Sequence, residues 1–395
     1  MKKSLVALAV AGVFAAPATF ADVTIGGAVN MGLSLDMVSN SPGSDNGYSQ
    51  TTLASNYSLM NISSVDDIGN GNSVVLNIQT ALGLNGTSSS LGNRDSYLGI
   101  KGNAGGLYWG TNENIYEQYM YESDPLDGSA GMGGNLQILG TPGASTVFDV
   151  GQSGCAATSA GAGGCVGFYR RTDDTIWYAS PNMSGWSFGV ALTTSSFKAS
   201  AGGDSQQVTS MGVQYKPDGG TFFINAAVER HTDMYGLNKL GGTATPGQGS
   251  QDTGMQVGVG LTFGDLSLVA RAERLSYKNN NQTTSGKYTE YQRDAMWFAG
   301  KLATASGYIG ASVGIADDAT CDKVGGGCTA DKTGAVMFGL GYFHNLSKQS
   351  QLMVIGSMMN NDDNAKYLHA GGANPLSTTA GITRKGVYLG VKHVF

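Results

Sequence analysis

The sequence predicts an all-β fold, a 16-stranded antiparallel transmembrane β-barrel, and three observations support this prediction. Segment after segment alternates apolar with small or polar residues, which is the period of a strand and not of a helix. The number of such segments is even. No stretch after residue 21 approaches the ~20 apolar residues that a membrane helix requires. One face of each segment suits lipid and the other suits water, as in a barrel around an aqueous lumen.

The segment WSFGVALTTS illustrates the alternation, with Trp186, Phe188 and Val190 on one face and Ser187 and Gly189 on the other. Sixteen such strands are expected at residues 23–36, 55–66, 72–85, 95–102, 105–111, 173–180, 186–198, 206–216, 221–233, 253–263, 266–278, 292–304, 308–317, 332–343, 351–361 and 383–395. A barrel of this size has a lumen too wide for side chains to fill. The alternative, a water-soluble sandwich, needs one shared apolar core and leaves open sheet edges.

Short turns and longer polar connections alternate along the chain, as they do in bacterial barrels with both termini on the periplasmic side. Asn70-Gly71 and Gly264-Asp265 are examples of the short turns. One connection, residues 112–172, is far longer than the others and follows the fifth strand.

The first 21 residues have the pattern of a secretory signal peptide. Lys2 and Lys3 precede a short apolar run, and small residues up to Ala21 form a cleavage site. The alternative is a buried N-terminal helix. We expect residues 1–21 to be removed and residues 22–395 to form a single barrel domain.

The mature chain is acidic. Without Lys2 and Lys3, the 29 acidic residues exceed the Lys and Arg residues by eight. This balance argues against a nucleic acid partner, because phosphate binding needs clustered cations.

Four cysteines occur as two local pairs in glycine-rich stretches, Cys155 with Cys165 and Cys321 with Cys328. In an exported chain this pattern suggests two short disulfides, although sequence alone does not fix the pairing. Zinc is the other interpretation, but the spacing is unsuitable and no histidine lies nearby. We expect no metal site and no cofactor.

Four motifs, taken in order, resemble the trimeric general porins of Gram-negative outer membranes, of the neisserial and betaproteobacterial type. They are VTIGGAVNMGLSLD at the start of the mature chain, RDSYLGIKGNAGGLYWG, RRTDDTIWYASPNMSGWSFGVAL and the terminal GVKHVF. The resemblance touches both ends and the middle of the chain. It implies an outer-membrane homotrimer whose long third loop, about residues 112–172, folds into the pore as a constriction.

The resemblance also implies where the charges of the constriction lie. The acidic side is expected at Glu113, Glu117, Glu122, Asp124 and Asp127. By parity and position along the strands, the basic wall is expected at Lys101, Arg170, Arg171, Arg271, Lys301 and Arg384, with Glu229 and Glu273 sharing the lumen. Opposed charges of this kind produce a transverse field that orients dipolar solutes. The alternative for the loop carboxylates is a solvated surface.

Several family positions that commonly carry Arg or Lys are uncharged in this chain. They are Leu59, Ser63, Tyr108, Thr111 and Trp177. The basic side is therefore thinned, and the sequence predicts a wide, weakly cation-preferring pore for passive diffusion of small hydrophilic solutes and ions.

Three other functions remain open at this point. Tyr108, Tyr116, Tyr119 and Tyr121 are candidates for an aromatic track in a substrate-specific channel. An enzyme would need an activated nucleophile, but the four histidines are dispersed and no G-x-S-x-G motif occurs. A structural or adhesive barrel would have a plugged lumen.

The last strand, GVYLGVKHVF, is expected to pair with the first, because an unpaired edge in lipid costs several kcal/mol per polar group. Val387 and Leu389 would face lipid and Tyr388 the lumen. In the resembling family the terminal aromatic, here Phe395, is read by the barrel-assembly machinery. The remaining expected partners are outer-membrane lipid and lipopolysaccharide.

Overall fold

A computed structural model describes residues 22–39, 47, 49–86, 90–122, 124–126, 132–143, 167–169, 171–193, 207–233, 236–237, 249–367 and 380–395. The expected signal peptide, the pair Cys155 and Cys165, and the predicted site residues Asp127 and Arg170 lie outside these ranges. Among the described residues, no helix is both long and apolar enough to cross a membrane.

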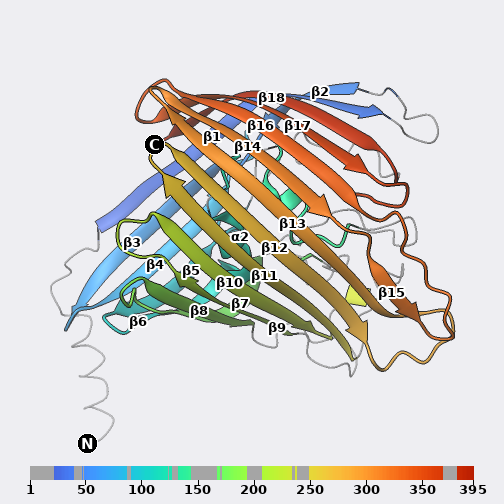
Figure 1. Cartoon of the computed structure of the whole chain (residues 1–395). Coiled ribbons are helices and arrows are strands. Elements are labelled where there is room, and N and C mark those ends of the chain that lie inside the picture. The colour runs from blue at the N-terminus through green and yellow to red at the C-terminus, as the bar shows by residue number, and fades with distance from the viewer. Residues whose placement is uncertain are drawn as a thin grey trace, which may run out of the picture.

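The named elements of the described residues are the strands of one sheet, one short α-helix and one turn of 3-10 helix (Figure 1); residues 236–237 are also helical. The strands are β1 (Asp22–Ser39), β2 (Ser49–Ser55), β3 (Leu59–Gly69), β4 (Asn72–Ala81), β5 (Ser96–Gly102), β6 (Gly105–Glu113), β7 (Arg171–Ala179), β8 (Trp186–Thr193), β9 (Gln207–Tyr215), β10 (Phe222–Thr232), β11 (Ser250–Phe263), β12 (Leu266–Asn279), β13 (Tyr288–Thr304), β14 (Gly307–Ala316), β15 (Thr320–Lys323), β16 (Ala335–Asn345), β17 (Ser350–Asn361) and β18 (Thr383–Val394). The helices are α2 (Ile115–Tyr121) and η1 (Asn135–Gln137).

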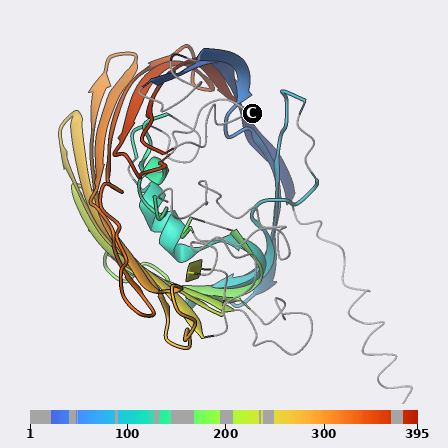
Figure 2. The ribbon, with the colours of Figure 1, turned by 90° about the vertical axis from the view of Figure 1, so that its right-hand side faces the viewer.

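The sheet is a closed 16-stranded antiparallel barrel, which confirms the predicted fold. Two barrel strands are each divided into two segments. β1 pairs with β2 through residues 31–37 and with β3 through residues 22–28. β13 pairs with β14 and, further along, with β15. Figure 2 shows the sheet curving into a ring with α2 inside it.

The closing seam joins β18 to β1, as predicted. The register runs from Ala28 opposite Val394 to Ser39 opposite Thr383. Phe395 extends the pairing, because its backbone N–H donates to Gly27 (3.1 Å) and its carbonyl accepts from Gly27 (3.0 Å). No edge strand is left without a partner at this seam.

Side chains alternate across the wall as the sequence predicts. On β8, Trp186, Phe188 and Val190 are exposed on the outer surface, whereas Gly189 and Ala191 are buried on the inner side. On β18, Tyr388 points inward and donates a hydrogen bond to Asn30 (2.7 Å). The exposed apolar surface is therefore the outside of the barrel, where lipid replaces water.

The short turns are built from residues that accept a positive φ. Asn70 and Gly71 have φ values of 55° and 73°. Two consecutive positive φ angles are typical of a type I′ hairpin turn, which Asn-Gly favours.

Cys321 and Cys328 form a disulfide, with their Cα atoms 5.8 Å apart and a sequence separation of 7. In the chain-entropy model a ring of this size contributes about 2–3 kcal/mol. The double variant C321S/C328S should therefore open this loop more often, which is measurable as faster amide hydrogen exchange around the loop. Because the ring joins the short strand β15 to the connection that follows it, away from the constriction loop, channel conductance should stay unchanged. Equal exchange in both proteins would contradict a stabilising role.

Candidate channel constriction

The long connection after β6 enters the barrel and places α2 against the inner wall. Ile115, Tyr116 and Met120 are buried there. Glycines in the wall provide the room: a Cβ atom on Gly212 would lie 2.4 Å from the Tyr119 ring, and one on Gly189 would lie 2.8 Å from Ile115. The inward-folded loop therefore depends on small residues in the strands that it covers.

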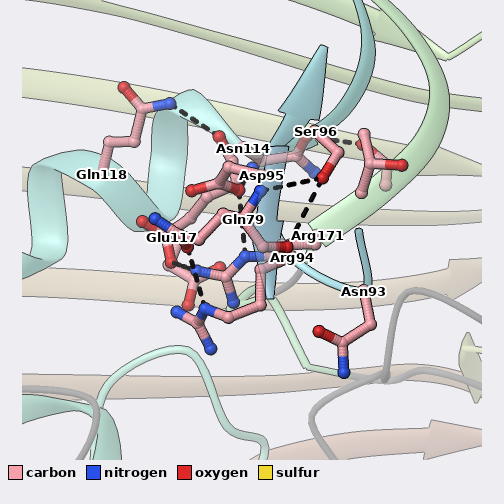
Figure 3. A network of polar contacts seen from close by, with 12 residues as sticks. Gln79, Asn93, Arg94, Asp95, Ser96, Asn114, Glu117, Gln118 and Arg171 are labelled. Atoms are coloured by element: carbon pink, nitrogen blue, oxygen red, sulfur yellow. Dashed lines mark hydrogen bonds and ion pairs between the residues drawn. The ribbon is translucent and has the colours of Figure 1, made fainter. Parts of the chain in front are cut away.

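One group of polar residues fastens the start of the loop to the wall (Figure 3). Arg171 Nε lies 2.9 Å from Asp95 Oδ1, and Arg171 Nη2 lies 2.5 Å from Glu113 Oε1. The backbone N–H of Glu113 also donates to Asp95 (2.8 Å). Arg94 donates to Gln79 (2.9 Å) and lies 4.7 Å above the Tyr57 ring. We call Arg94, Asp95, Glu113, Glu117 and Arg171 the first anchor.

A second anchor lies on the opposite flank of α2 and has no exposed surface. Arg293 Nη2 is 2.9 Å from Glu273 Oε1, and both side chains are fully buried. Glu273 also accepts hydrogen bonds from the Tyr116 hydroxyl (2.8 Å) and the Gly140 backbone N–H (2.8 Å). Arg293 donates to the carbonyl of Thr141. Arg293 and Glu273 thus both bond the loop to the wall, and these bonds offset part of the cost of burying the two charges. Nε and Nη1 of Arg293 find no hydrogen-bond partner among the described residues.

A third anchor holds the end of α2. Glu122 Oε1 lies 3.0 Å from Lys216 Nζ, and Glu122 also accepts hydrogen bonds from Asn225 (3.2 Å) and Gln214. Arg271 donates to the carbonyl of Glu122 (2.9 Å) and to Asn225 (3.0 Å). The guanidinium of Arg271 therefore forms hydrogen bonds with both the wall and the end of α2.

The structure gives the predicted acidic residues a fastening role. Glu113 and Glu117 are buried in the first anchor, and Glu117 accepts a hydrogen bond from Tyr121. Glu122 belongs to the third anchor. Asp124 accepts from the backbone N–H groups of Leu126 (2.9 Å) and Asn135 (2.7 Å) and so shapes the loop. Acidic loop and basic wall meet at contact distance here, instead of facing each other across open water.

The predicted basic residues divide into two sets. Arg171 and Arg271 belong to anchors, and Arg384 is buried. Lys101 and Lys301 are exposed near short turns, on the inward parity of their strands.

The tyrosines predicted to form a solute track also fall into two sets, according to their burial. Tyr116 has no exposed surface, so it does not line the water-filled space. Tyr121 is partly buried and donates to Glu117. Tyr108 and Tyr119 are half-buried, and the Tyr108 ring stacks on Trp177 with centroids 5.4 Å apart.

Sequence reasoning missed Arg293, Arg94 and Asp95. Strand parity could have identified Arg293, because it shares the parity of Ala295 and Trp297, both buried on the inner side of β13. Arg94 and Asp95 open the motif RDSYLG, where Arg94 precedes the predicted strand 95–102 and Asp95 is its first residue, so the alternation assigned neither to the lumen.

A family model described as Gram-negative porin matches residues 4–364. The chain belongs to the Gram-negative porin family. Family and fold together make this porin an outer-membrane channel for solutes and indicate a channel in place of an enzyme.

Solved structures agree with this porin in fold. An anion-selective porin from Comamonas acidovorans has a TM-score of 0.71 at 18% identity, covering 95% of this chain and 100% of that one. OmpT of Vibrio cholerae in its trimer form gives 0.61 at 12% identity, with 95% and 99% covered. Salmonella typhi OmpF in complex with daunomycin gives 0.57 at 14% identity, with 95% and 98% covered. Among curated protein sequences, none matches the chain significantly.

Proposed function

We propose that this porin is a passive diffusion channel for small hydrophilic solutes and ions, with a weak preference for cations. The observation that carries the proposal is the set of three anchors, which fix the loop against one side of the lumen. A fixed loop narrows the passage without plugging it, so solutes are filtered by width and by the charge of the lining.

The charge balance of the described lumen supports the cation preference. Carboxylates outnumber cationic side chains among the inward residues around the loop. The nine carboxylates are Asp36, Asp95, Glu113, Glu117, Glu122, Asp124, Glu229, Asp252 and Glu273; the eight cations are Arg94, Lys101, Arg171, Lys216, Arg271, Arg293, Lys301 and Arg384. Because the excess of carboxylates is small and many charges of both signs are paired, the net field on a passing ion is small and negative, which favours cations only weakly.

Solute flux tests the diffusion proposal. Liposomes that contain the purified porin should swell in sugar solutions at rates that fall smoothly with solute size and rise linearly with concentration. Protein-free liposomes are the control. A rate that saturates, or one sugar that enters far faster than others of its size, would contradict a general channel.

Acidification should weaken the cation preference. Burial raises the pKa of the Glu117 carboxyl, and although Arg171 and the hydrogen bond from Tyr121 lower it, the net direction is upward. A raised pKa means that the fold favours the protonated form, so lowering the pH removes lumen charge without a stability loss from this group. As the pH falls from neutral towards the ordinary glutamate pKa of about 4.3, the ratio of cation to anion permeability should move towards unity before that pKa is reached. E117Q should flatten this change, and a ratio that rises on acidification would contradict it.

A substrate-specific channel is the second candidate. Tyr97, Tyr108 and Trp177 form an aromatic cluster on the inner wall, and Tyr119 of α2 packs against it. Such rings suit the apolar faces of sugars. Competitive block of conductance by one sugar, lost in Y108A, would favour this candidate over general diffusion.

We also infer a homotrimer in the outer membrane, in contact with lipid and lipopolysaccharide and inserted by the barrel-assembly machinery. The trimer form of OmpT and the exposed apolar outer surface of the barrel support this inference. Chemical cross-linking in native membranes should yield dimer and trimer bands, and monomer alone would contradict it.

A further inference from the structure

A cavity of about 250 Å³ lies inside the barrel between the loop residues Asp124 and Pro125 and the short-turn ends of five wall strands, β10 to β14. Its polar rim follows the register of the sheet: Thr262 pairs with Ser267, and Ser267 pairs with Lys301. The two hydroxyl oxygens are 3.1 Å apart. Three adjacent strands therefore present two hydroxyls and an ammonium group in one row.

The next row towards the constriction is apolar. Phe223 pairs with Gly260, Gly260 with Val269, and Val269 with Ala299. Phe223, Val269 and Ala299 are almost fully buried. The Phe223 ring covers Gly260, where an added Cβ atom would lie 2.1 Å from the ring. The cavity thus has an apolar floor directly behind its polar rim.

The end of the cavity at Lys301 is positive. Lys301 Nζ lies 4.3 Å above the Tyr308 ring, and no ion pair of Lys301 is found among the described residues. The Tyr308 ring stacks on Phe343 at 4.3 Å, which keeps the aromatic face below the ammonium group in place. Lys216 also lines the cavity, although its charge is shared with Glu122. The Asp124 carboxylate, at the loop side of the cavity, accepts hydrogen bonds from two backbone N–H groups of the loop, which hold it towards the loop.

We propose that this cavity binds small organic monocarboxylates that carry an apolar body, at the periplasmic end of the channel. The carboxylate is oriented to Lys301 and the hydroxyls of Thr262 and Ser267, and the apolar part lies on Phe223, Val269 and Ala299. A charge-assisted hydrogen bond to an ammonium group is roughly twice as strong as a neutral one, so the anion fixes the orientation. The site adds a solute-binding step to the proposed channel function, and its role in solute passage rests on that function. It makes the lumen asymmetric, with a negative constriction and a positive pocket behind it.

Benzoate is the probe, with acetate lacking the apolar body and benzyl alcohol lacking the charge. Dissociation constants are measured by NMR titration of the purified porin in detergent micelles, so that binding is read without conductance. Benzoate should bind more tightly than either comparison compound. K301M should raise the dissociation constant for benzoate about tenfold, and S267E should do the same by placing a carboxylate opposite Lys301. K101M, which removes another inward lysine near a short turn, is the matched control and should leave benzoate binding unchanged.

Equal effects of K301M and K101M, or equal binding of benzoate and acetate, would overturn the proposal. Circular dichroism and heat-resistant migration on gels check that each variant is folded, and S267E gives an independent result if K301M does not fold. Wild-type porin that binds benzoate yet conducts nothing would refute the channel function and leave the site intact. Wild-type porin that conducts but does not distinguish the three probes would refute the site alone.

Discussion

Replacing Arg293 with methionine should destabilise this porin by about 3–5 kcal/mol and release the constriction loop from the wall. Arg293 and Glu273 are fully buried 2.9 Å apart, and Glu273 also holds the Tyr116 hydroxyl and the Gly140 N–H. Removal of the guanidinium leaves a buried carboxylate without its cation. The protein can relieve that cost by moving the loop so that water reaches Glu273.

The free energy of unfolding in urea, followed by tryptophan fluorescence in detergent micelles, measures the first effect. Current noise in the open channel measures the second and should increase. R274M is the matched control, because Arg274 and Asp294 also join β12 to β13 at 2.6 Å but are exposed on the outer face. Exposed pairs of this kind contribute little. If R293M behaved like R274M, the second anchor would not hold the loop.

Deletion of Phe395 should reduce the amount of folded porin in the membrane several-fold, with little change in the conductance of the molecules that do insert. Phe395 makes two backbone hydrogen bonds with Gly27, and its ring occupies the space beside that glycine, where a Cβ atom would lie 2.9 Å from the ring. Without this residue the seam loses both bonds at a membrane boundary, where unpaired polar groups are costly.

The assay compares heat-modifiable, folded protein in isolated outer membranes. F395Y, which keeps an aromatic ring and both backbone bonds, should assemble like the wild type. F395A keeps the two backbone hydrogen bonds but removes the ring, so it distinguishes the contribution of the ring from that of the bonds. Normal assembly of the deletion variant would show that neither the seam contact nor the ring matters for insertion.

The strands could be predicted because alternation is a local signal. Trp186, Phe188 and Val190 face outward, and the last strand closes on the first as its pattern requires. The break between β2 and β3 could not be predicted. There Tyr57 adopts a φ of 51° beneath the Arg94 guanidinium, and that contact is between residues far apart in the chain.

For the constriction, the sequence could predict which residues take part but not which partners they bond. Glu113 and Glu122 were expected in the constriction, but their partners depend on the path of the loop across the lumen. Arg293 meets Glu273 diagonally across two strands and reaches the Thr141 carbonyl on the loop. Neither register nor loop path can be read from a single sequence, so the fastening role of the carboxylates became visible only in the structure.

A planar bilayer recording in a tenfold salt gradient tests the central claim most directly, namely that the anchored loop leaves an open, weakly negative passage. We expect steps of conductance that occur in groups of three, no saturation with salt, and a small reversal potential whose sign indicates cation flow. A reversal potential of the opposite sign would contradict the charge assignment, and an absence of conductance would contradict the open passage itself.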